Sequence, residues 1–85
     1  MQHTDIHTGD TLILKADNNY GIDASTPLYV LALDERPGYK VPHIRAMCEL
    51  PDGTETYGAF RPSDFQRHAD ANEVEVAWLK QNGRL

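Results

Sequence analysis

The chain has 85 residues, of which 40% are hydrophobic and 25% are charged, proportions that are typical of one globular domain. Thirteen acidic and eight basic side chains give a formal net charge of −5, which opposes general nucleic-acid binding because phosphates are normally met by a basic surface. The single cysteine excludes an internal disulfide, and no apolar stretch approaches the ~20 residues that a membrane-spanning helix needs.

The first predicted strand follows a turn. Gly9 and Asp10 are a turn signal, and Leu12 and Leu14 then share one strongly apolar face, which indicates a short strand. Residues 16–27 are rich in Asp, Asn, Gly and Ser, all of which favour turns. This segment is therefore predicted to be a long loop, and long loops in small domains often carry function.

The strongest predicted strand covers residues 27–35, because apolar side chains lie on both of its faces. Two apolar faces are typical of a strand at the centre of a sheet. Pro37 and Gly38 then predict a turn within residues 36–42. Alternation would place Tyr29, Leu31 and Leu33 on one face of the strand, and Leu28, Val30 and Ala32 on the other.

Two further strands are predicted on either side of a tight turn. We expect the Cys48 thiol to be buried and to behave as a small apolar group. Pro51-Asp52-Gly53 predicts a hairpin turn with Gly53 in the left-handed conformation. In the return strand, residues 54–60, Gly58 indicates a bulge or the close approach of another backbone. Before the turn, alternation directs Ile44, Ala46, Cys48 and Leu50 inward, and His43, Arg45, Met47 and Glu49 outward.

The end of the chain is open to two interpretations. Residues 62–65 predict a single helical turn that Ser63 or Asp64 helps to cap. In the tail that follows, Val74, Val76 and Trp78 alternate as in a strand. However, Asp70 with Glu73, and Asn72 with Glu75, have the spacing of a capping box, and Asn82-Gly83 is a helix stop. We favour a helix over about residues 71–82, which Trp78 would dock onto the rest of the domain.

The order of strand, long polar loop, central strand, turn, strand, tight hairpin, strand and helical turn resembles the SH3-like small β-barrel. In this comparison, residues 16–27 take the place of the long first loop, 34–42 of the second loop and 51–53 of the distal turn. The resemblance implies a mainly β fold, a barrel of about five strands with a C-terminal helix or an extra strand. Bacterial and phage proteins use similar barrels for unrelated tasks, so the resemblance alone assigns no function.

The expected organisation is one domain over residues 1–85. A flexible N-terminus (1–8) would precede the barrel (9–65), and the C-terminal helix (70–83) would follow it. The first ten residues lack the basic and apolar regions of a secretory signal. We therefore expect the protein in the cytoplasm, without contact to a membrane.

No residue pattern indicates catalysis or a metal site. His3 and His7 have the four-residue spacing of a helical metal pair, but the threonines and the glycine around them oppose a helix. Neighbouring carboxylates such as Asp34 and Glu35 point to opposite faces of a strand and do not converge. We expect no catalytic residue, no metal site, no cofactor and no enzymatic activity.

The tyrosines indicate a binding surface. Tyr20 lies in the first loop and Tyr39 beside the second turn. The SH3-like resemblance implies that these loops border one groove, so that both tyrosines would reach a shared ligand. Arg45 and Arg61, with Lys40, form a local basic patch. Tyr20, Tyr39, Arg45 and Arg61 are therefore the predicted binding residues; the alternative is that the tyrosines only cover barrel edges.

These features together predict a small non-catalytic binding module, either a protein–protein interaction domain or an accessory factor, whose protein partner is unknown. Self-association through a C-terminal stripe of Val74, Trp78 and Leu85 is a further hypothesis. The alternative is a nucleic-acid-related protein, which would be a local DNA or RNA binder or an acidic inhibitor of a DNA-binding enzyme. The net charge disfavours direct binding of nucleic acid.

Overall fold

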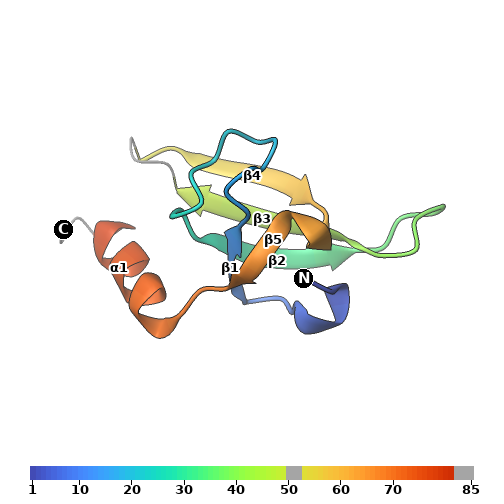
Figure 1. Ribbon diagram of the computed structural model, residues 1–85, viewed down its shortest axis with the longest axis horizontal. Coiled ribbons are helices and arrows are strands. Elements are labelled where there is room, and N and C mark those ends of the chain that lie inside the picture. Colours follow the sequence, from blue (N-terminus) through green and yellow to red (C-terminus); the bar gives the residue numbers. More distant parts are fainter. Residues whose placement is uncertain (50–52, 82–85) are drawn as a thin grey trace.

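The computed structural model describes residues 1–49 and 53–81, and within these ranges most of the regular structure is β (Figure 1). The mainly β fold with a C-terminal helix, predicted from the sequence, is therefore confirmed. In chain order the elements are η1 (His3–Asp5), β1 (Thr11–Leu14), β2 (Leu28–Asp34), β3 (His43–Glu49), β4 (Glu55–Phe60), η2 (Pro62–Asp64), β5 (Phe65–His68) and α1 (Ala71–Gln81), where η denotes a 3-10 turn. No helix of the described chain is long and apolar enough to cross a membrane.

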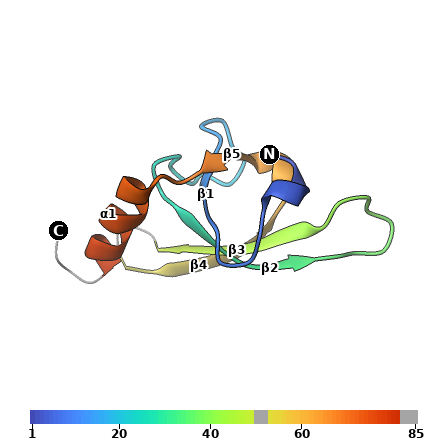
Figure 2. The same ribbon diagram turned by 90° about the horizontal axis from the view of Figure 1, so that it is seen from below.

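The five strands form one antiparallel sheet in the order β4-β3-β2-β1-β5. In the described chain β4 and β5, which end this order, do not pair with each other, so the sheet is not closed into a barrel. Figure 2 shows β2, β3 and β4 as one layer, from which β1 rises towards β5 on the far side. Because strands twist, a single sheet can curl in this way around its own core.

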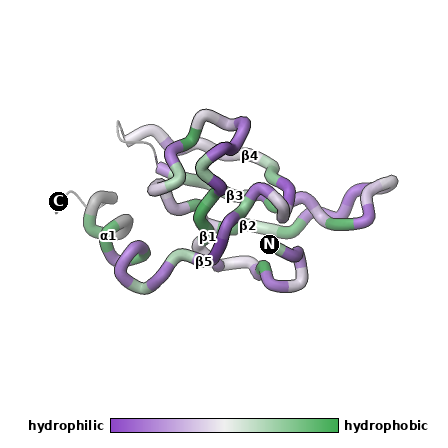
Figure 3. Tube along the Cα trace, in the orientation of Figure 1, coloured by the Kyte–Doolittle hydropathy of each residue, from purple (hydrophilic) through white to green (hydrophobic). Residues whose placement is uncertain are grey.

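The core lies between this layer and β5, and every strand contributes to it. Figure 3 shows hydrophobic residues gathered along β1 and β2, at the centre of the molecule. Burying each large apolar side chain contributes roughly 1.5–3 kcal/mol, so this cluster is the main source of stability. Its buried members are Ile6, Leu12, Leu14, Leu28, Val30, Ile44, Ala46, Cys48, Phe60 and Phe65.

The N-terminal segment packs against the sheet, whereas the sequence predicts a flexible end over residues 1–8. Ile6 is only 2% exposed and belongs to the core. The amino group of Met1 donates hydrogen bonds to the carbonyl oxygens of Pro62, at 3.3 Å, and Phe65, at 3.2 Å. A single apolar residue among polar neighbours gave no periodic signal, so the role of Ile6 depends on contacts with distant parts of the chain.

A bulge in β2 changes which side chains of this strand face the core. The pairing of β2 with β3 shifts between Val30 and Ala32, so Leu31 is the extra residue. Before the bulge Val30 is fully buried, while Tyr29 points outward and is 48% exposed. After the bulge it is Leu33 that packs against the core. The apolar pattern on both faces thus reflects a change of phase along the strand, and Tyr29 and Leu33 lie on different faces.

The hairpin of β3 and β4 follows the predicted pattern in most respects. Cys48 is buried, as expected. Gly53 has a φ of +85°, the predicted left-handed conformation, while Pro51 and Asp52 lie outside the described residues. Gly58 does not mark a bulge, because β3 and β4 pair without a shift. Instead, a Cβ at Gly58 would lie 3.2 Å from two ring atoms of Phe60, so the glycine leaves room for that ring.

The end of the chain contains both a strand and a helix. The predicted helical turn is present as η2, and β5 follows it directly. β5 has only four residues and a single buried side chain, Phe65, so it carries no alternation that could reveal it. The predicted helix is confirmed as α1, and the Asp70–Glu73 capping box forms as expected. The side chain of Trp78 and the residues from 82 onward lie outside the described part.

Candidate functional site

Asn18 organises the loop that carries Tyr20. Its side-chain amide donates hydrogen bonds to the carbonyl oxygens of Lys15, at 2.9 Å, and Ile22, at 2.8 Å. Its side-chain oxygen accepts a hydrogen bond from the backbone N–H of Tyr20, at 3.0 Å. Asparagine side chains replace backbone partners in turns in this way. The conformation of the loop, and with it the position of Tyr20, is therefore fixed locally.

Two contacts with residues distant in the sequence, Asp64 of η2 and Phe60 of β4, hold the side chain of Tyr20. Its hydroxyl donates a hydrogen bond of 2.6 Å to Oδ2 of Asp64, and its ring meets the ring of Phe60 edge-on, with centroids 4.7 Å apart. Partial burial, followed by the hydrogen bond to the negatively charged Asp64, raises the pKa of Tyr20 to about 12. The side chain remains 42% exposed. Tyr20 is thus held by two contacts, and part of its side chain remains accessible to solvent.

Tyr39 lies in the loop between β2 and β3, which contains the predicted turn. The backbone N–H of Tyr39 donates to the carbonyl oxygen of Arg36, at 3.2 Å, and Gly38 between them has a φ of +85°. The ring of Tyr39 packs edge-on against His43, with centroids 4.8 Å apart. Nδ1 of His43 is buried without a hydrogen-bond partner. Tyr39 remains 60% exposed.

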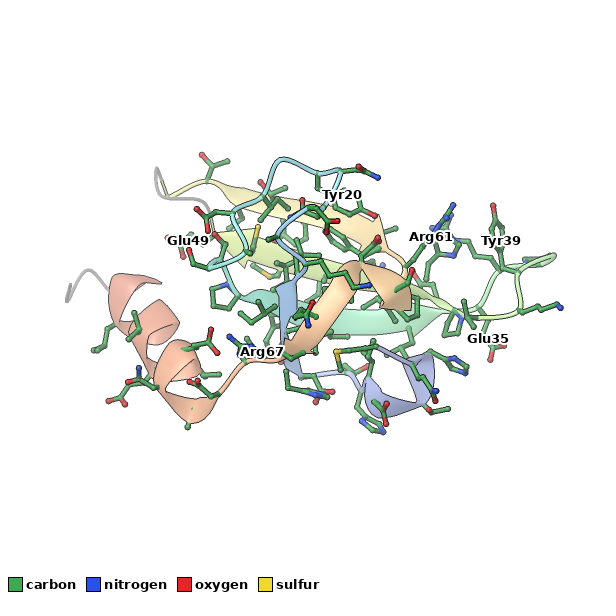
Figure 4. The ribbon with its side chains drawn as sticks, in the orientation of Figure 1. Tyr20, Glu35, Tyr39, Glu49, Arg61 and Arg67 are labelled. Atoms are coloured by element: carbon green, nitrogen blue, oxygen red, sulfur yellow. The ribbon has the colours of Figure 1, made fainter. Side chains whose placement is uncertain are left out.

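The four predicted binding residues lie in different parts of the surface. Figure 4 shows Arg61 between Tyr20 and Tyr39, which sit on separate loops. Among the contacts of the described residues, none joins the two tyrosines. Arg45 belongs to the solvent side of β3, where its Nε lies 3.6 Å from Oδ2 of Asp34 on β2. The groove predicted from the resemblance is therefore not formed by direct contact between these side chains.

A row of three large side chains crosses the solvent side of β2, β3 and β4, which we call the outer face. Tyr29 on β2 pairs with Met47 on β3, and Met47 pairs with Tyr57 on β4. Directly opposite residues on one face have Cβ atoms about 4.5–5.5 Å apart, so the three side chains adjoin. Tyr29 is 48% and Tyr57 60% exposed. The alternation of β3 predicts that Met47 points outward, and this is confirmed. The row itself could not be predicted, because the face on which Tyr29 lies depends on the bulge in β2.

Charges of opposite sign lie on the two sides of this row. Glu49 and Glu55 are direct cross-strand partners on the side towards the β3–β4 turn. Glu55 accepts a 2.7 Å hydrogen bond from the hydroxyl of Tyr57, and this bond, with the charge of Glu55, raises the pKa of Tyr57. On the other side of the row, Arg45 lies between Ala32 and Ala59. The outer face thus carries two acids on one side of the aromatic row and, on the other side, Arg45 with Asp34 3.6 Å away.

The outer face is open in the part of the chain that the structure describes. In Figure 2 the described loops and α1 lie above or beside the layer of β2, β3 and β4, and none of them crosses beneath it. α1 is held at the side by Arg67 of β5, whose guanidinium contacts both carboxylate oxygens of Glu73. This contact fixes the start of α1 away from the row of Tyr29, Met47 and Tyr57. No element of the described chain therefore stands between a partner and the outer face, although the N-terminal segment adjoins the row at Tyr29, whose hydroxyl would lie 3.9 Å from a Cβ at Gly9.

The N-terminal turn carries a small polar cluster around Asp10. Oδ2 of Asp10 accepts a 2.8 Å hydrogen bond from the backbone N–H of His7 and lies 3.1 Å from Nε2 of His68. Burial raises the pKa of Asp10, but these hydrogen bonds and the two histidines outweigh it and leave the pKa lowered. Within residues 1–49 and 53–81, no three His, Cys, Asp or Glu side chains are grouped as a metal site. The cluster joins the N-terminal turn to β5.

No family model, curated protein or solved structure matches the chain. Its function has to be inferred from the geometry of its own residues. The outer face and the anchored Tyr20 are the two surface features on which such an inference can rest.

Proposed function

We propose that this chain is a non-catalytic binding module that recognises a protein through the outer face of β2, β3 and β4. The observation that carries the proposal is the row of Tyr29, Met47 and Tyr57, which is in direct register and is not covered by any element of residues 1–49 and 53–81. Single exposed apolar residues are ordinary, whereas a contiguous uncovered row marks an interaction surface. Tyrosine and methionine are also enriched where proteins meet.

We further propose that the chain is built on the SH3-like plan. In support, the strand order is β4-β3-β2-β1-β5, the longest polar loop joins β1 to β2, and a 3-10 turn stands between β4 and β5. SH3-like barrels have these parts in this order. The absence of a ladder between β4 and β5 in the described chain makes this an open version of that plan.

A protein partner is favoured over nucleic acid by the charges on the outer face. Glu49 and Glu55 lie side by side at one end of it and would repel a phosphate backbone. At the other end, Arg45 forms an ion pair with Asp34, which offsets its positive charge. The buried Cys48 supplies no nucleophile to the surface, and its thiol pKa is raised by burial. These features support binding without chemistry.

The test compares proteins captured by immobilised wild-type chain with those captured by two variants. The first variant carries Tyr29→Ser and Tyr57→Ser, which remove the ends of the row. The control carries Tyr39→Ser, at an equally exposed tyrosine outside the row. We expect the first variant to lose a bound protein that the control retains. Loss in the control alone would move the site to the loops, and captured nucleic acid released steeply by salt would overturn the proposal.

A further inference from the structure

We infer that the outer face binds a second copy of this chain, related to the first by a two-fold axis along the row of Tyr29, Met47 and Tyr57. The inference rests on the proposed function and names the partner of the same surface. Two-fold dimers are the commonest protein assemblies, and each copy contributes the same patch. A patch of this kind has to be complementary to itself, and the outer face meets that condition in the order of its side chains and charges along β3.

The charge pattern follows from the register of β3. Arg45 lies two residues from Met47 in one direction, and Glu49 lies two residues from it in the other. The proposed axis passes over Met47 and runs along the row, perpendicular to the strands. A 180° rotation about it reverses the direction of each strand, and each strand then faces its own counterpart in the second copy. Glu49 of one copy then comes over Arg45 of the other, and the reverse contact forms at the same time. The single two-fold rotation therefore forms two contacts between opposite charges.

The same axis brings each member of the row against its own copy. Tyr29 meets Tyr29, Met47 meets Met47 and Tyr57 meets Tyr57 across the interface. Facing sheets pack ~10 Å apart, with strands within ~30° of alignment, so side chains of this size fill the space between them. Tyrosine rings have favourable offset and edge-on arrangements, and a thioether packs well between rings.

A second copy fits the outer face better than a purely basic partner does. Glu49 and Glu55 are like charges placed directly opposite each other, an arrangement that is unfavourable unless a cation approaches. A partner with only basic groups would relieve this pair but would be repelled by Arg45 beyond the row. A second copy supplies an arginine to the acidic side of the row and a glutamate to Arg45, where it shares the guanidinium with Asp34.

The dimer should be weak and reversible. A face three strands wide is at or below the ~800 Å² per partner that stable interfaces bury. Asp34 also takes up part of the charge of Arg45, with 3.6 Å between Oδ2 and Nε. We expect a dissociation constant on the order of 10–100 μM, which leaves a mostly monomeric protein at low concentration.

Analytical ultracentrifugation from about 5 to about 500 μM tests the inference, because mass action then populates the dimer. We expect the wild type to shift from monomer to dimer, and Tyr57→Ser to weaken the dimer about tenfold or more. Arg45→Glu and Glu49→Arg should each weaken it through two like-charge contacts. Mixing these two variants should restore association, because both contacts in the mixed dimer join opposite charges. The double variant Arg45→Glu, Glu49→Arg should also associate.

Two controls separate the interface from folding. Tyr39→Ser and Arg36→Glu change exposed loop positions outside the outer face and should dimerise as the wild type does. Circular dichroism should confirm that each variant keeps its β structure. If Arg45→Glu does not fold, because it places a second acid beside Asp34, the comparison of Tyr57→Ser with Tyr39→Ser still decides the outcome.

A wild type that stays monomeric at the highest concentration overturns the inference. A dimer that is indifferent to Tyr57→Ser overturns it as well, since the interface would then lie elsewhere. Failure of the dimer alone leaves the proposed function standing if the variant with Tyr29→Ser and Tyr57→Ser still loses a captured protein. If that variant captures what the wild type captures, the proposed function fails independently.

Discussion

The phenol oxygen of Tyr20 lies 2.6 Å from Oδ2 of Asp64, although 44 residues separate them in the sequence. The same carboxylate oxygen accepts the backbone N–H of Arg61, at 2.8 Å. One side chain therefore closes the η2 turn and also fastens the β1–β2 loop to it. Because the ring of Tyr20 rests on Phe60, this contact connects the surface loop to the core.

Tyr20→Phe should destabilise the fold modestly. The variant keeps the ring on Phe60 and removes only the hydroxyl that donates to Asp64. A hydrogen bond to a charged acceptor contributes about 1.5–3 kcal/mol, and partial exposure reduces this, so we expect a loss of about 1 kcal/mol. Urea unfolding measures it. Tyr39→Phe, at a loop position, is the matched control, and an equal loss in both variants would contradict the prediction.

One tyrosine should ionise late in an alkaline titration. The pKa of Tyr20 is raised to about 12, so its neutral form is favoured in the folded protein. The associated stability is fully present below the ordinary tyrosine pKa near 10 and is lost as the pH rises from there towards 12. Absorbance near 295 nm should show this late step, which Tyr20→Phe should remove. Its persistence in the variant would assign it to another tyrosine.

Glu73→Gln should release the start of α1. Its carboxylate is held by Arg67 and by the backbone N–H of Asp70, and these bonds lower the pKa of Glu73 to about 2. The wild-type contact is complete above the ordinary glutamate pKa and is lost as the pH falls from there towards 2. Circular dichroism at 222 nm should show reduced helix in the variant already at neutral pH. Glu75→Gln, at an exposed position of the same helix, should leave the signal unchanged.

Gly58→Ala should crowd the core side of β4. The new Cβ would lie 3.2 Å from the Phe60 ring, which also contacts Tyr20 and Phe65 and so has little freedom to move. Overpacking of this kind costs about 1–3 kcal/mol. In a Phe60→Leu background the same substitution should cost less, which a double-mutant cycle measures. Equal costs in both backgrounds would show that the ring is not the cause.

The thiol of Cys48 should be protected in the folded protein. It is 4% exposed, and burial raises its pKa, so little reactive thiolate is available. At neutral pH, a thiol reagent should label Cys48 of the folded protein only at the rate at which the fold opens. In urea, which unfolds the protein, labelling should be rapid. Ser63→Cys combined with Cys48→Ala provides an exposed thiol as the control. Equally fast labelling of both native proteins would contradict the burial.

Several elements could be predicted because their signals are local. Three of the strands follow from alternation, since β side chains have a period of two residues. The turn at Gly53 and the Asp70–Glu73 capping box follow from side chains and backbone angles within a few residues. The burial of Cys48 follows from its position in an alternating strand. None of these features needs a partner from a distant part of the chain.

The candidate surface could be predicted only in part. Tyr20 and Tyr39 were identified as exposed aromatic residues in loops, and both are exposed. The contact of Tyr20 with Asp64 and the position of Arg45 beside Asp34 could not be inferred, because each joins different elements. β5 was missed because four residues with one buried side chain carry no period.

By itself, the sequence determined a small β domain with an acidic balance, alternating strands and a terminal helix. The tertiary structure decided that Tyr29 faces outward, because the bulge at Leu31 changes the phase of β2 along its length. It also decided that Tyr29, Met47 and Tyr57 form a row, because their alignment is a matter of register between strands. Register is set between neighbouring strands, β2 with β3 and β3 with β4, and a one-residue shift moves a side chain to the opposite face.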